Sequence, residues 1–253
     1  MTVYRKGDIE LRLGDYRDVL ADVEPDAVIT DPPYSERTHS KQTHGRKKAA
    51  YSPDACLTAR GLEYGSWSEQ DIAAFVGRWA RTRGWVAVFH DHTMRASYEA
   101  LLVEARRYVF APLACVQTGM NVRLAGDGPS NWTCWLTVSR LSTLRHWGTL
   151  RGAYWVGQDQ DRKRAHTVCG GKPLGLMRQV VRDYSRPRDL VCDPCAGGAT
   201  TLIAAAMEGR RAIGAELDPA TYELACKRIA RTAITPPLFV DERPRAEQIG
   251  LLE

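Results

Sequence analysis

The sequence has no long apolar run, and none of its hydrophobic stretches approaches the roughly 20 residues that a membrane-spanning helix requires. The N-terminal residues MTVYRKGD also lack the apolar core of a secretory signal peptide. We therefore expect a cytoplasmic protein that has no membrane partner.

The sequence also lacks an even, clustered set of cysteines and a large excess of charge of one sign. The seven cysteines are odd in number and scattered, and Cys115, Cys134 and Cys192 sit in apolar runs, where a reduced thiol acts as a small core residue. Disulfides are therefore not expected. The formal net charge of +5 is only mildly basic, so it permits a nucleic-acid partner without requiring one.

What is present is the composition of an ordinary soluble enzyme. Hydrophobic residues make up 44% and charged residues 26% of the 253 residues. A chain of this length can bury a sizeable core. We expect a single domain over residues 1–253.

The most informative stretch is residues 27–34, with the sequence AVITDPPY. Its first four residues predict a short buried strand, which the two prolines end because proline cannot donate to a sheet ladder. Asp31 and Tyr34 are then exposed at a strand's carboxyl end, where open α/β sheets bind ligands. The Asp31 carboxylate and the Pro32 carbonyl can accept from an exocyclic amine while the Tyr34 ring stacks on the heterocycle. Taken alone, such a short pattern is more often a simple turn.

A second acid is expected at the same edge. Residues 9–13 alternate apolar and charged side chains, as a half-exposed strand does, and the strand ends at Gly14 and Asp15. Residues 16–23 can form a short helix that returns the chain to Ala27, giving a β-α-β unit. Asp15 and Asp31 therefore fall on one rim.

Residues 35–66 form a candidate basic insertion loop without apolar periodicity. The loop holds six Lys and Arg residues against three acids, a balance of 6 − 3 = +3. Such a loop can lie along a phosphate backbone or be a solvated insertion, and the segment alone favours neither. In the first case the phosphate contacts come from Arg37, Lys41, Arg46, Lys47 and Lys48.

The middle of the chain predicts alternating helices and strands. The expected elements are a helix over residues 69–81 capped by Ser68, a strand over 85–89, a helix from after Thr93 to about Arg107, and strands over 108–117 and 131–140, which finish a mixed sheet antiparallel. The adjacent His90, Asp91 and His92 resemble metal ligands, yet neighbours in an extended chain point to opposite faces. We expect a structural or polar-lining role for them rather than a metal site.

Residues 141–171 are irregular and mix cations with aromatic rings. This interleaving suits stacking on bases and neutralising phosphates, although Trp147 and Trp155 can equally pack under the loop. We favour the first interpretation and take residues 141–165 as a candidate target-recognition region, in which Arg145 and Arg151 contact DNA.

The second half of the expected site lies late in the chain. A strand over residues 189–193 runs into the small-residue turn PCAGGATT and a helix over 202–208, whose free amides and dipole can approach a ligand closely. The next strand, 212–216, ends in Glu216, where a carboxylate can take both hydroxyls of a ribose. Asp218 and Pro219 then begin a helix that ends near Arg231.

Cys192 and Cys195 have the C-x-x-C spacing of redox and zinc motifs. The pattern begins inside a buried strand and has no partner pair, so we expect packing or ligand contact instead.

Together these motifs resemble the amino-group DNA methyltransferases of the permuted β class, which use S-adenosylmethionine. The matching parts are Gly14-Asp15, Thr30-Asp31-Pro32-Pro33-Tyr34, Gly171-Lys172-Pro173, residues 193–201 and Glu216. The order carries the resemblance, because the catalytic turn precedes the cofactor turn. Cys195 and Gly198 stand where the family has Phe and Ser, so only the backbone role carries over there.

The resemblance implies a Rossmann-like, seven-stranded mixed sheet with helices on both faces, circularly permuted so that the strand of Asp15 lies beside that of Glu216. By the resemblance, Asp193 would hold the methionine amino group, Glu216 the ribose and Asp15 the adenine amine of the cofactor. Lys172 and Pro173 would lead a segment that covers the methionine side. The other cofactor-binding residues implied are Asp31, Pro194, Ala196, Gly197, Gly198 and Thr200.

The target base would be held by Asp31, Pro32, Pro33 and Tyr34 after flipping out of double-stranded DNA, since a base inside a duplex cannot reach such a pocket. In the family, Asp before Pro-Pro-Tyr is associated mainly with N6 of adenine, so N6-adenine methylation is the expected reaction and N4-cytosine methylation the alternative. A DNA-binding module without turnover is a further alternative. A homodimer is possible.

Overall fold

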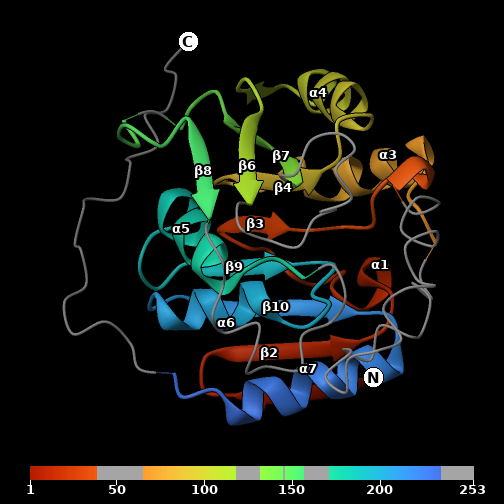
Figure 1. Cartoon of the computed structure of the whole chain (residues 1–253), viewed down its shortest axis with the longest axis vertical. Coiled ribbons are helices and arrows are strands. Elements are labelled where there is room, and N and C mark those ends of the chain that lie inside the picture. Colours follow the sequence, from red (N-terminus) through yellow and green to blue (C-terminus); the bar gives the residue numbers. More distant parts are fainter. Residues whose placement is uncertain (39–64, 118–131, 145, 157–170, 235–253) are drawn as a thin grey trace, which may run out of the picture.

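The structure is a computed structural model that describes residues 1–38, 65–117, 132–144, 146–156 and 171–234 (Figure 1). None of the helices within these ranges is long and apolar enough to cross a membrane. The strands are β1 (Thr2–Lys6), β2 (Ile9–Leu13), β3 (Ala27–Thr30), β4 (Val86–His90), β5 (Arg107–Val109), β6 (Leu113–Gln117), β7 (Trp132–Leu141), β8 (Ala153–Val156), β9 (Leu190–Asp193) and β10 (Arg211–Glu216). The helices are α1 (Tyr16–Val19), α3 (Glu69–Trp79), α4 (Arg95–Glu104), α5 (Leu174–Tyr184), α6 (Thr200–Met207) and α7 (Pro219–Arg231).

One mixed sheet organises the molecule, in the order β1-β2-β10-β9-β3-β4-β7-β6-β8, with β5 paired to β7. The strands β2, β10, β9, β3 and β4 are parallel, and β7 runs antiparallel to β4 and β6. Because parallel strands present their carboxyl ends at one edge, the acids that end or follow β2, β3, β9 and β10 gather there.

The pairing of β2 with β10 confirms that the strand before Asp15 lies beside the strand of Glu216. Glu216 is in register with Leu13, and the amide of Gly14 donates to the Glu216 carbonyl at 2.9 Å. The circular permutation that the resemblance implies stays a prediction.

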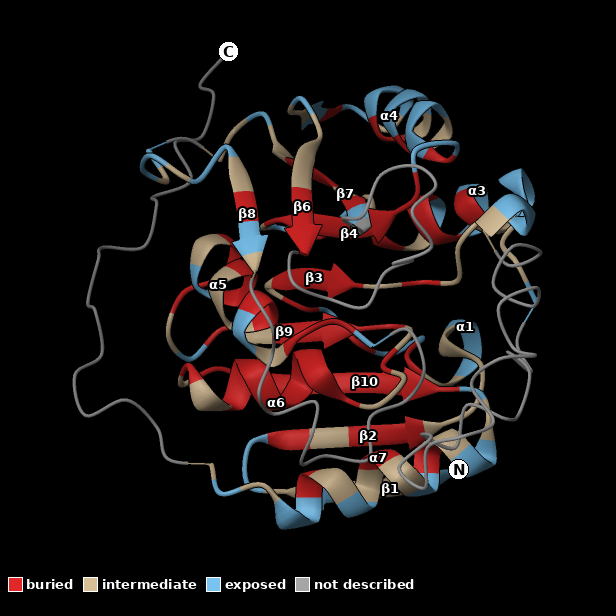
Figure 2. Ribbon diagram, in the orientation of Figure 1, coloured by how far each residue is buried: buried red, intermediate tan, exposed pale blue. Residues whose placement is uncertain are grey.

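Helices cover both faces of the sheet. Side chains of α5, α6 and α7 pack with Ile29 and Val191 on one face, whereas side chains of α3 and α4 pack with Val28 and Cys192 on the other. Successive strand residues thus enter opposite cores, as the period of a strand requires. Figure 2 shows the result, a sheet that is buried through most of its strands.

Helix α3 illustrates why burial is needed. An isolated helix of its 11 residues is marginal in water. Its apolar stripe, Ile72, Phe75, Val76 and Trp79, is buried, and each such side chain contributes about 1.5–3 kcal/mol. The predicted Ser68 cap is confirmed as a capping box with Asp71.

The sheet has ten strands in the described residues, and the predicted count of seven is wrong. The additional strands are β1, β5 and β8. The other seven strands are consecutive in the sheet order, from β2 through β10, β9, β3, β4 and β7 to β6. The predicted strand over 108–117 is two strands, β5 and β6, which pair with different parts of β7 and are separated by residues 110–112, where Pro112 lacks an amide hydrogen.

Three elements escaped the sequence patterns, namely β1, β8 and α5. Helix α5 was not predicted, although its buried Leu176, Met177, Val180 and Val181 have helical spacing. Strand β8 lies inside the region predicted to be irregular and pairs in parallel with β6. The helix expected to reach Arg107 ends at Glu104, because Arg106 adopts a left-handed φ of 60°.

Candidate active site

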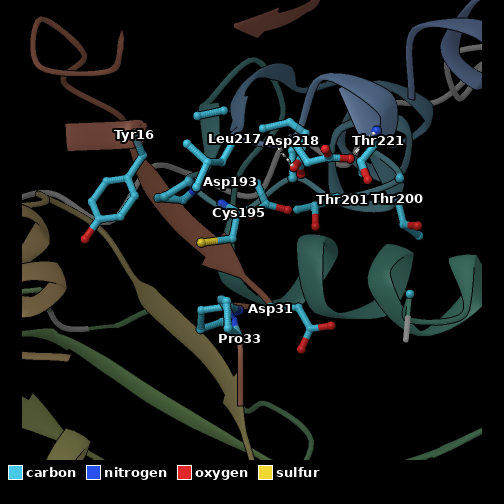
Figure 3. A pocket seen from close by; sticks show the side chains of 18 of the residues that line it. Tyr16, Asp31, Pro33, Asp193, Cys195, Thr200, Thr201, Leu217, Asp218 and Thr221 are labelled. Atoms are coloured by element: carbon cyan, nitrogen blue, oxygen red, sulfur yellow. Dashed lines mark hydrogen bonds between the residues drawn. The ribbon is translucent and has the colours of Figure 1, made fainter. Parts of the chain in front are cut away.

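The acids at the carboxyl edge of the sheet line one cavity of about 460 Å³. Asp15, Asp31, Asp193 and Glu216 all contribute to its wall, which confirms that the Asp15 and Asp31 turns meet on one rim. Figure 3 shows Asp31 and Asp193 beside the small-residue turn that contains Cys195. The cavity also includes Pro32, Pro33, Tyr34, Lys172, Pro194, Ala196, Gly197, Gly198 and Thr200.

Asp31 follows β3, and one of its carboxylate oxygens pairs with a lysine. Its Oδ2 accepts from Nζ of Lys172 at 2.5 Å. Its Oδ1 is buried and makes no hydrogen bond of ordinary geometry with the described residues, although the Tyr34 hydroxyl is close enough to interact with the Asp31 carboxylate. A buried acceptor without a donor is costly, so Oδ1 suits a ligand that brings an N–H group.

Lys172 is buried deeply for a lysine. Its side chain is 3% exposed, and Nζ lies 4.9 Å from the ring centroid of Tyr34 and 5.2 Å from that of Phe89. A buried ammonium needs a counter-charge, which Asp31 provides. Pro173 does not line the cavity; it is the N-cap of α5, and its carbonyl accepts from the Met177 amide.

Asp193 ends β9 and is almost fully buried. Its Oδ1 accepts from the Thr30 hydroxyl at 2.6 Å and from the Cys195 amide at 3.1 Å. Burial raises the pKa of Asp193 to about 6, against the lowering effect of hydrogen bonds from Thr201 and Thr30. The carboxylate is therefore held in place and is poorly solvated.

The turn after Asp193 is tightened by backbone geometry. Gly197 and Ala199 have φ values of 50° and 59°, in the left-handed region. A Cβ on Gly214 would stand 2.9 Å from the Asp193 carbonyl and 3.0 Å from the Ala196 side chain, so glycine is required for β10 to pass this close. Burial raises the pKa of the Cys195 thiol well above its usual value, and Cys195 lies at the cavity as a neutral group.

Glu216 ends β10 and is also buried. Its Oε1 accepts from the Asp218 amide at 2.8 Å. Burial raises the pKa of Glu216 to about 7, although hydrogen bonds from the Asp218 and Gly197 amides lower it. Two carboxyl groups with raised pKa values thus end neighbouring strands, and such groups cluster at functional sites.

Asp15 has a partner that the sequence did not predict. It caps α1, and its Oδ2 accepts from Nη2 of Arg17 at 2.5 Å. Hydrogen bonds from Arg17 hold the pKa of Asp15 below its ordinary value. Asp15 is therefore an ionised carboxylate at neutral pH.

The site residues predicted from the sequence did not include Tyr16, Trp67 or Arg228. Tyr16 and Trp67 line the cavity with ring centroids 6.4 Å apart, and Tyr16 directly follows the strand-end Gly-Asp pair, which is the signal that was available for it. Nη1 of Arg228, on α7, donates to the Gly198 carbonyl and to the Thr200 hydroxyl, both at 2.7 Å. No local pattern in the sequence indicated that α7 would brace this turn.

The predicted DNA contacts are only partly within the described residues. Arg37 hydrogen-bonds His92 at 2.8 Å, and Arg151 pairs with Asp183 at 2.6 Å. The other predicted contacts, Lys41, Arg46, Lys47, Lys48 and Arg145, lie outside the described residues.

The two tryptophans of the 141–165 region differ. Nε1 of Trp147 donates to the Asp183 carbonyl at 2.7 Å, and the Arg186 guanidinium lies 3.7 Å from its ring centroid. Trp147 is therefore packed against α5, as the alternative interpretation required. Trp155 is 69% exposed.

The His90-Asp91-His92 stretch has the structural role that was expected. His90 is buried and bonds the Thr137 hydroxyl at 2.7 Å. Asp91 accepts from the Ser35 amide at 3.1 Å and from the Thr38 hydroxyl at 2.6 Å, which anchors the chain after the Pro-Pro-Tyr turn. Within the described ranges, no cluster of three or more potential ligands could hold a metal ion.

Solved structures share this fold. The crystal structure of the M1.HpyAVI–SAM complex aligns over 87% of this chain and 99% of its own length, with a TM-score of 0.60 at 17% identity. The PvuII DNA methyltransferase, which is cytosine-N4-specific, aligns over 90% of this chain and 89% of its own, with a TM-score of 0.58 at 14% identity. At these identities the likeness establishes the fold.

Sequence comparison adds the family. M.MthZI, a Type II methyltransferase from Methanothermobacter thermautotrophicus, is 37% identical over 86 residues, which are 34% of this chain. The chain spans only 21–30% of the length of the curated relatives it matches. The profile of the N6/N4 methyltransferase family, described as DNA methylase, matches residues 78–227. Because that match covers more than half of the chain and includes the Asp193 turn and Glu216, the protein belongs to this family of DNA amino-methyltransferases.

Proposed function

We propose that this protein transfers a methyl group from S-adenosylmethionine to N6 of adenine in double-stranded DNA. The observation that carries the proposal is the buried Oδ1 of Asp31, an acceptor that makes no hydrogen bond of ordinary geometry with the described residues, at a cavity that also contains the buried carboxyl groups of Asp193 and Glu216. An exocyclic amine would satisfy that oxygen, and a ligand with an ammonium group and a ribose would suit the other two acids.

The residues present fit S-adenosylmethionine. Asp193 would take the amino group, Glu216 the ribose hydroxyls and Asp15 the adenine amine. Arg17 already donates to both oxygens of Asp15 from its amide, Nε and Nη2, so the adenine amine would share this carboxylate with Arg17.

The remaining contacts would come from two segments. Lys172 and Pro173 would lead the segment on the methionine side. The backbone cradle would come from Pro194, Ala196, Gly197, Gly198 and Thr200. When bound, the cofactor supplies a methyl group on a positively charged sulfur.

The target amine is a weak nucleophile, because its lone pair is delocalised into the base. Asp31 Oδ1 and the Pro32 carbonyl would each accept a hydrogen bond from the amine. This favours a tetrahedral nitrogen whose lone pair is free to attack the methyl carbon. Pro33 keeps the turn extended, and Tyr34 would stack on the base. No covalent enzyme intermediate is needed, so these residues act by orientation and electrostatics.

DNA binding would require base flipping, with the extruded base entering beside Tyr34. Arg37, Lys41, Arg46, Lys47 and Lys48 would neutralise phosphates, and Arg145 and Arg151 would act in the target-recognition region 141–165. For Arg151 this role means sharing its guanidinium between Asp183 and a phosphate. The proposed enzyme is a single domain over residues 1–253, in which residues 35–66 form an insertion. It would be able to form a homodimer.

N4 of cytosine is the second candidate target. The likeness to the cytosine-N4-specific PvuII enzyme favours it. The resemblance of Asp31-Pro32-Pro33-Tyr34 to adenine-specific turns favours N6, and both bases present an amine beside a ring nitrogen.

The test is to incubate the purified protein with methyl-labelled S-adenosylmethionine and mixed-sequence DNA, digest the DNA to nucleosides and identify the modified one by mass spectrometry. N6-methyladenine is the expected product. N4-methylcytosine would change the base and leave the site chemistry, whereas DNA without label would indicate a binding module. RNA in a parallel reaction tests the substrate class.

A further inference from the structure

We propose that Lys172 is a positioning residue, which holds Oδ2 of Asp31 so that Oδ1 faces the amine of the target base. This inference rests on the proposed function. It assigns Lys172 a role through Asp31, in addition to its place beside the expected methionine end of the cofactor.

The first support is the contact itself. Nζ of Lys172 donates a charge-assisted hydrogen bond to Asp31 Oδ2 at 2.5 Å, which is shorter than the roughly 2.7–2.9 Å usual for such pairs. Lys172 precedes α5 and Asp31 follows β3, so two separate elements set the relative position of the two groups. The lysine side chain is 3% exposed, which leaves the ammonium little freedom to exchange its partner for water.

The second support is the surroundings of the ammonium. Its distances to the Tyr34 and Phe89 ring centroids, 4.9 Å and 5.2 Å, are within the range of cation–π attraction. Two rings and one carboxylate therefore confine the ammonium. Tyr34, which is expected to stack on the base, and Asp31, which is expected to hold the amine, both touch the same lysine.

The third support is the difference between the two oxygens of Asp31. The terminal torsion of an aspartate is broad, so a free carboxylate rotates easily. Anchoring Oδ2 removes that rotation and determines where Oδ1 lies. Oδ1 is buried and makes no hydrogen bond of ordinary geometry in the described part of the chain, so the anchored carboxylate presents one vacant acceptor. An acceptor arranged before the reaction needs no reorganisation during it.

Direct contact with the cofactor and positioning through Asp31 predict different behaviour of Lys172→Met. If Lys172 only holds the cofactor, the substitution weakens S-adenosylmethionine binding and acts equally with or without the Asp31 carboxylate. If it positions Asp31, the substitution lowers turnover and has no further effect once Asp31→Asn has removed the carboxylate.

The experiment measures single-turnover methyl transfer into DNA, and S-adenosylmethionine affinity by calorimetry, for wild type, Lys172→Met, Asp31→Asn and the double variant. We expect Lys172→Met to lower the transfer rate about 100-fold, the size of effect that slight misplacement of a reacting group produces. Because Lys172 also lies beside the expected methionine end of the cofactor, some loss of cofactor affinity is allowed, but we expect it to be smaller than the loss of transfer rate. We expect the double variant to transfer at the rate of Asp31→Asn. Equal losses in both backgrounds, a wild-type rate for Lys172→Met, or a loss confined to cofactor affinity would each overturn the proposal.

Controls separate this inference from the proposed function. Lys227→Met removes a lysine that is exposed on α7 and should leave transfer unchanged. An inactive wild type would overturn both proposals, whereas an active wild type with an equally active Lys172→Met overturns only this one. If Lys172→Met does not fold, Lys172→Arg replaces it, with a loss again expected only when Asp31 is present. If methyl transfer by Asp31→Asn is below detection, the double variant gives no information. A crystal structure of Lys172→Met then tests the proposal, and an Asp31 carboxylate in its wild-type orientation would contradict it.

Discussion

Thr30 donates its hydroxyl to Oδ1 of Asp193 at 2.6 Å, and this buried bond joins the end of β3 to the end of β9. Thr30 leads directly to the Pro-Pro-Tyr turn, whereas Asp193 leads to the small-residue turn. The proposed base-holding and cofactor-holding halves of the cavity are therefore coupled through one hydroxyl group.

Replacing Thr30 by Val should weaken S-adenosylmethionine binding by about 10-fold or more, because a hydrogen bond to a charged group is worth about 1.5–3 kcal/mol. The Asp193 carboxylate is almost fully buried, so water would replace the lost donor poorly. Isothermal calorimetry measures the effect, and Thr30→Ser, which keeps the hydroxyl, should bind as the wild type does. Equal affinity of Thr30→Val and wild type would contradict the coupling.

Cofactor affinity should rise with pH between about 5.5 and 8, because Asp193 and Glu216 have pKa values raised to about 6 and about 7 and must lose protons to hold an ammonium and a ribose. Stability without cofactor should change in the opposite direction. The folded state holds protons that the unfolded state releases near pH 4, so the free energy of unfolding should fall as pH rises from about 4 to about 7.

Calorimetry and urea unfolding across this pH range test the two trends. Asp193→Asn cannot titrate, so it should flatten the part of both curves near pH 6. A pH-independent affinity in the wild type would argue against carboxylate contacts with the cofactor.

Asp31→Ala should lower the rate of methyl transfer by orders of magnitude, and it should also destabilise the fold. The Lys172 ammonium would be left buried without its counter-charge, which costs about 3–5 kcal/mol. Adding Lys172→Met to Asp31→Ala should restore most of the stability and none of the activity. Thermal denaturation with a parallel activity assay tests this, and a double variant no more stable than Asp31→Ala would contradict the buried pair.

Tyr34→Ala should mainly weaken capture of the flipped base, whereas Tyr34→Phe should be much milder, because it keeps the ring that stacks. The rise in KM for DNA should be about 10-fold for the alanine variant, since stacking on an aromatic ring is worth about 1–3 kcal/mol per base. Fluorescence of 2-aminopurine at the target position reports flipping directly. A large loss in Tyr34→Phe would instead assign a chemical role to the hydroxyl.

Neutralising Arg46, Lys47 and Lys48 together should weaken DNA binding on every sequence and flatten its dependence on salt, since each phosphate contact contributes to the salt slope. Titrations of labelled duplexes at several salt concentrations measure both quantities. The matched control replaces Arg95, which is exposed on α4 and pairs with Glu99. An unchanged salt dependence in the triple variant would indicate that residues 35–66 are a solvated insertion that does not contact phosphates.

The sequence by itself determined the features that depend on neighbouring residues. Pro32 and Pro33 end β3 because proline cannot donate to a sheet, and Asp218 with Pro219 begins α7 because these residues satisfy and tolerate the free amides of a first turn. Acids at strand ends could be placed on one edge because parallel strands share their direction. The resemblance, and not periodicity, indicated that β2 lies beside β10.

Only the tertiary structure decided which side chains meet across the site. Lys172 and Asp31 are 141 positions apart, Thr30 and Asp193 are 163 apart, and no pattern along the chain relates them. Arg228 braces the Asp193 turn because the packing of α7 brings this long side chain within reach. The pair of Arg17 with Asp15 is different, since it is a local contact within the first turn of α1. Burial then raised the pKa values of Asp193 and Glu216, a property of the desolvated cavity and not of the residue types. Edge strands such as β8 were also missed because they depend on distant partners. A short strand is specified by the strand it pairs with, here β6, rather than by its own sequence.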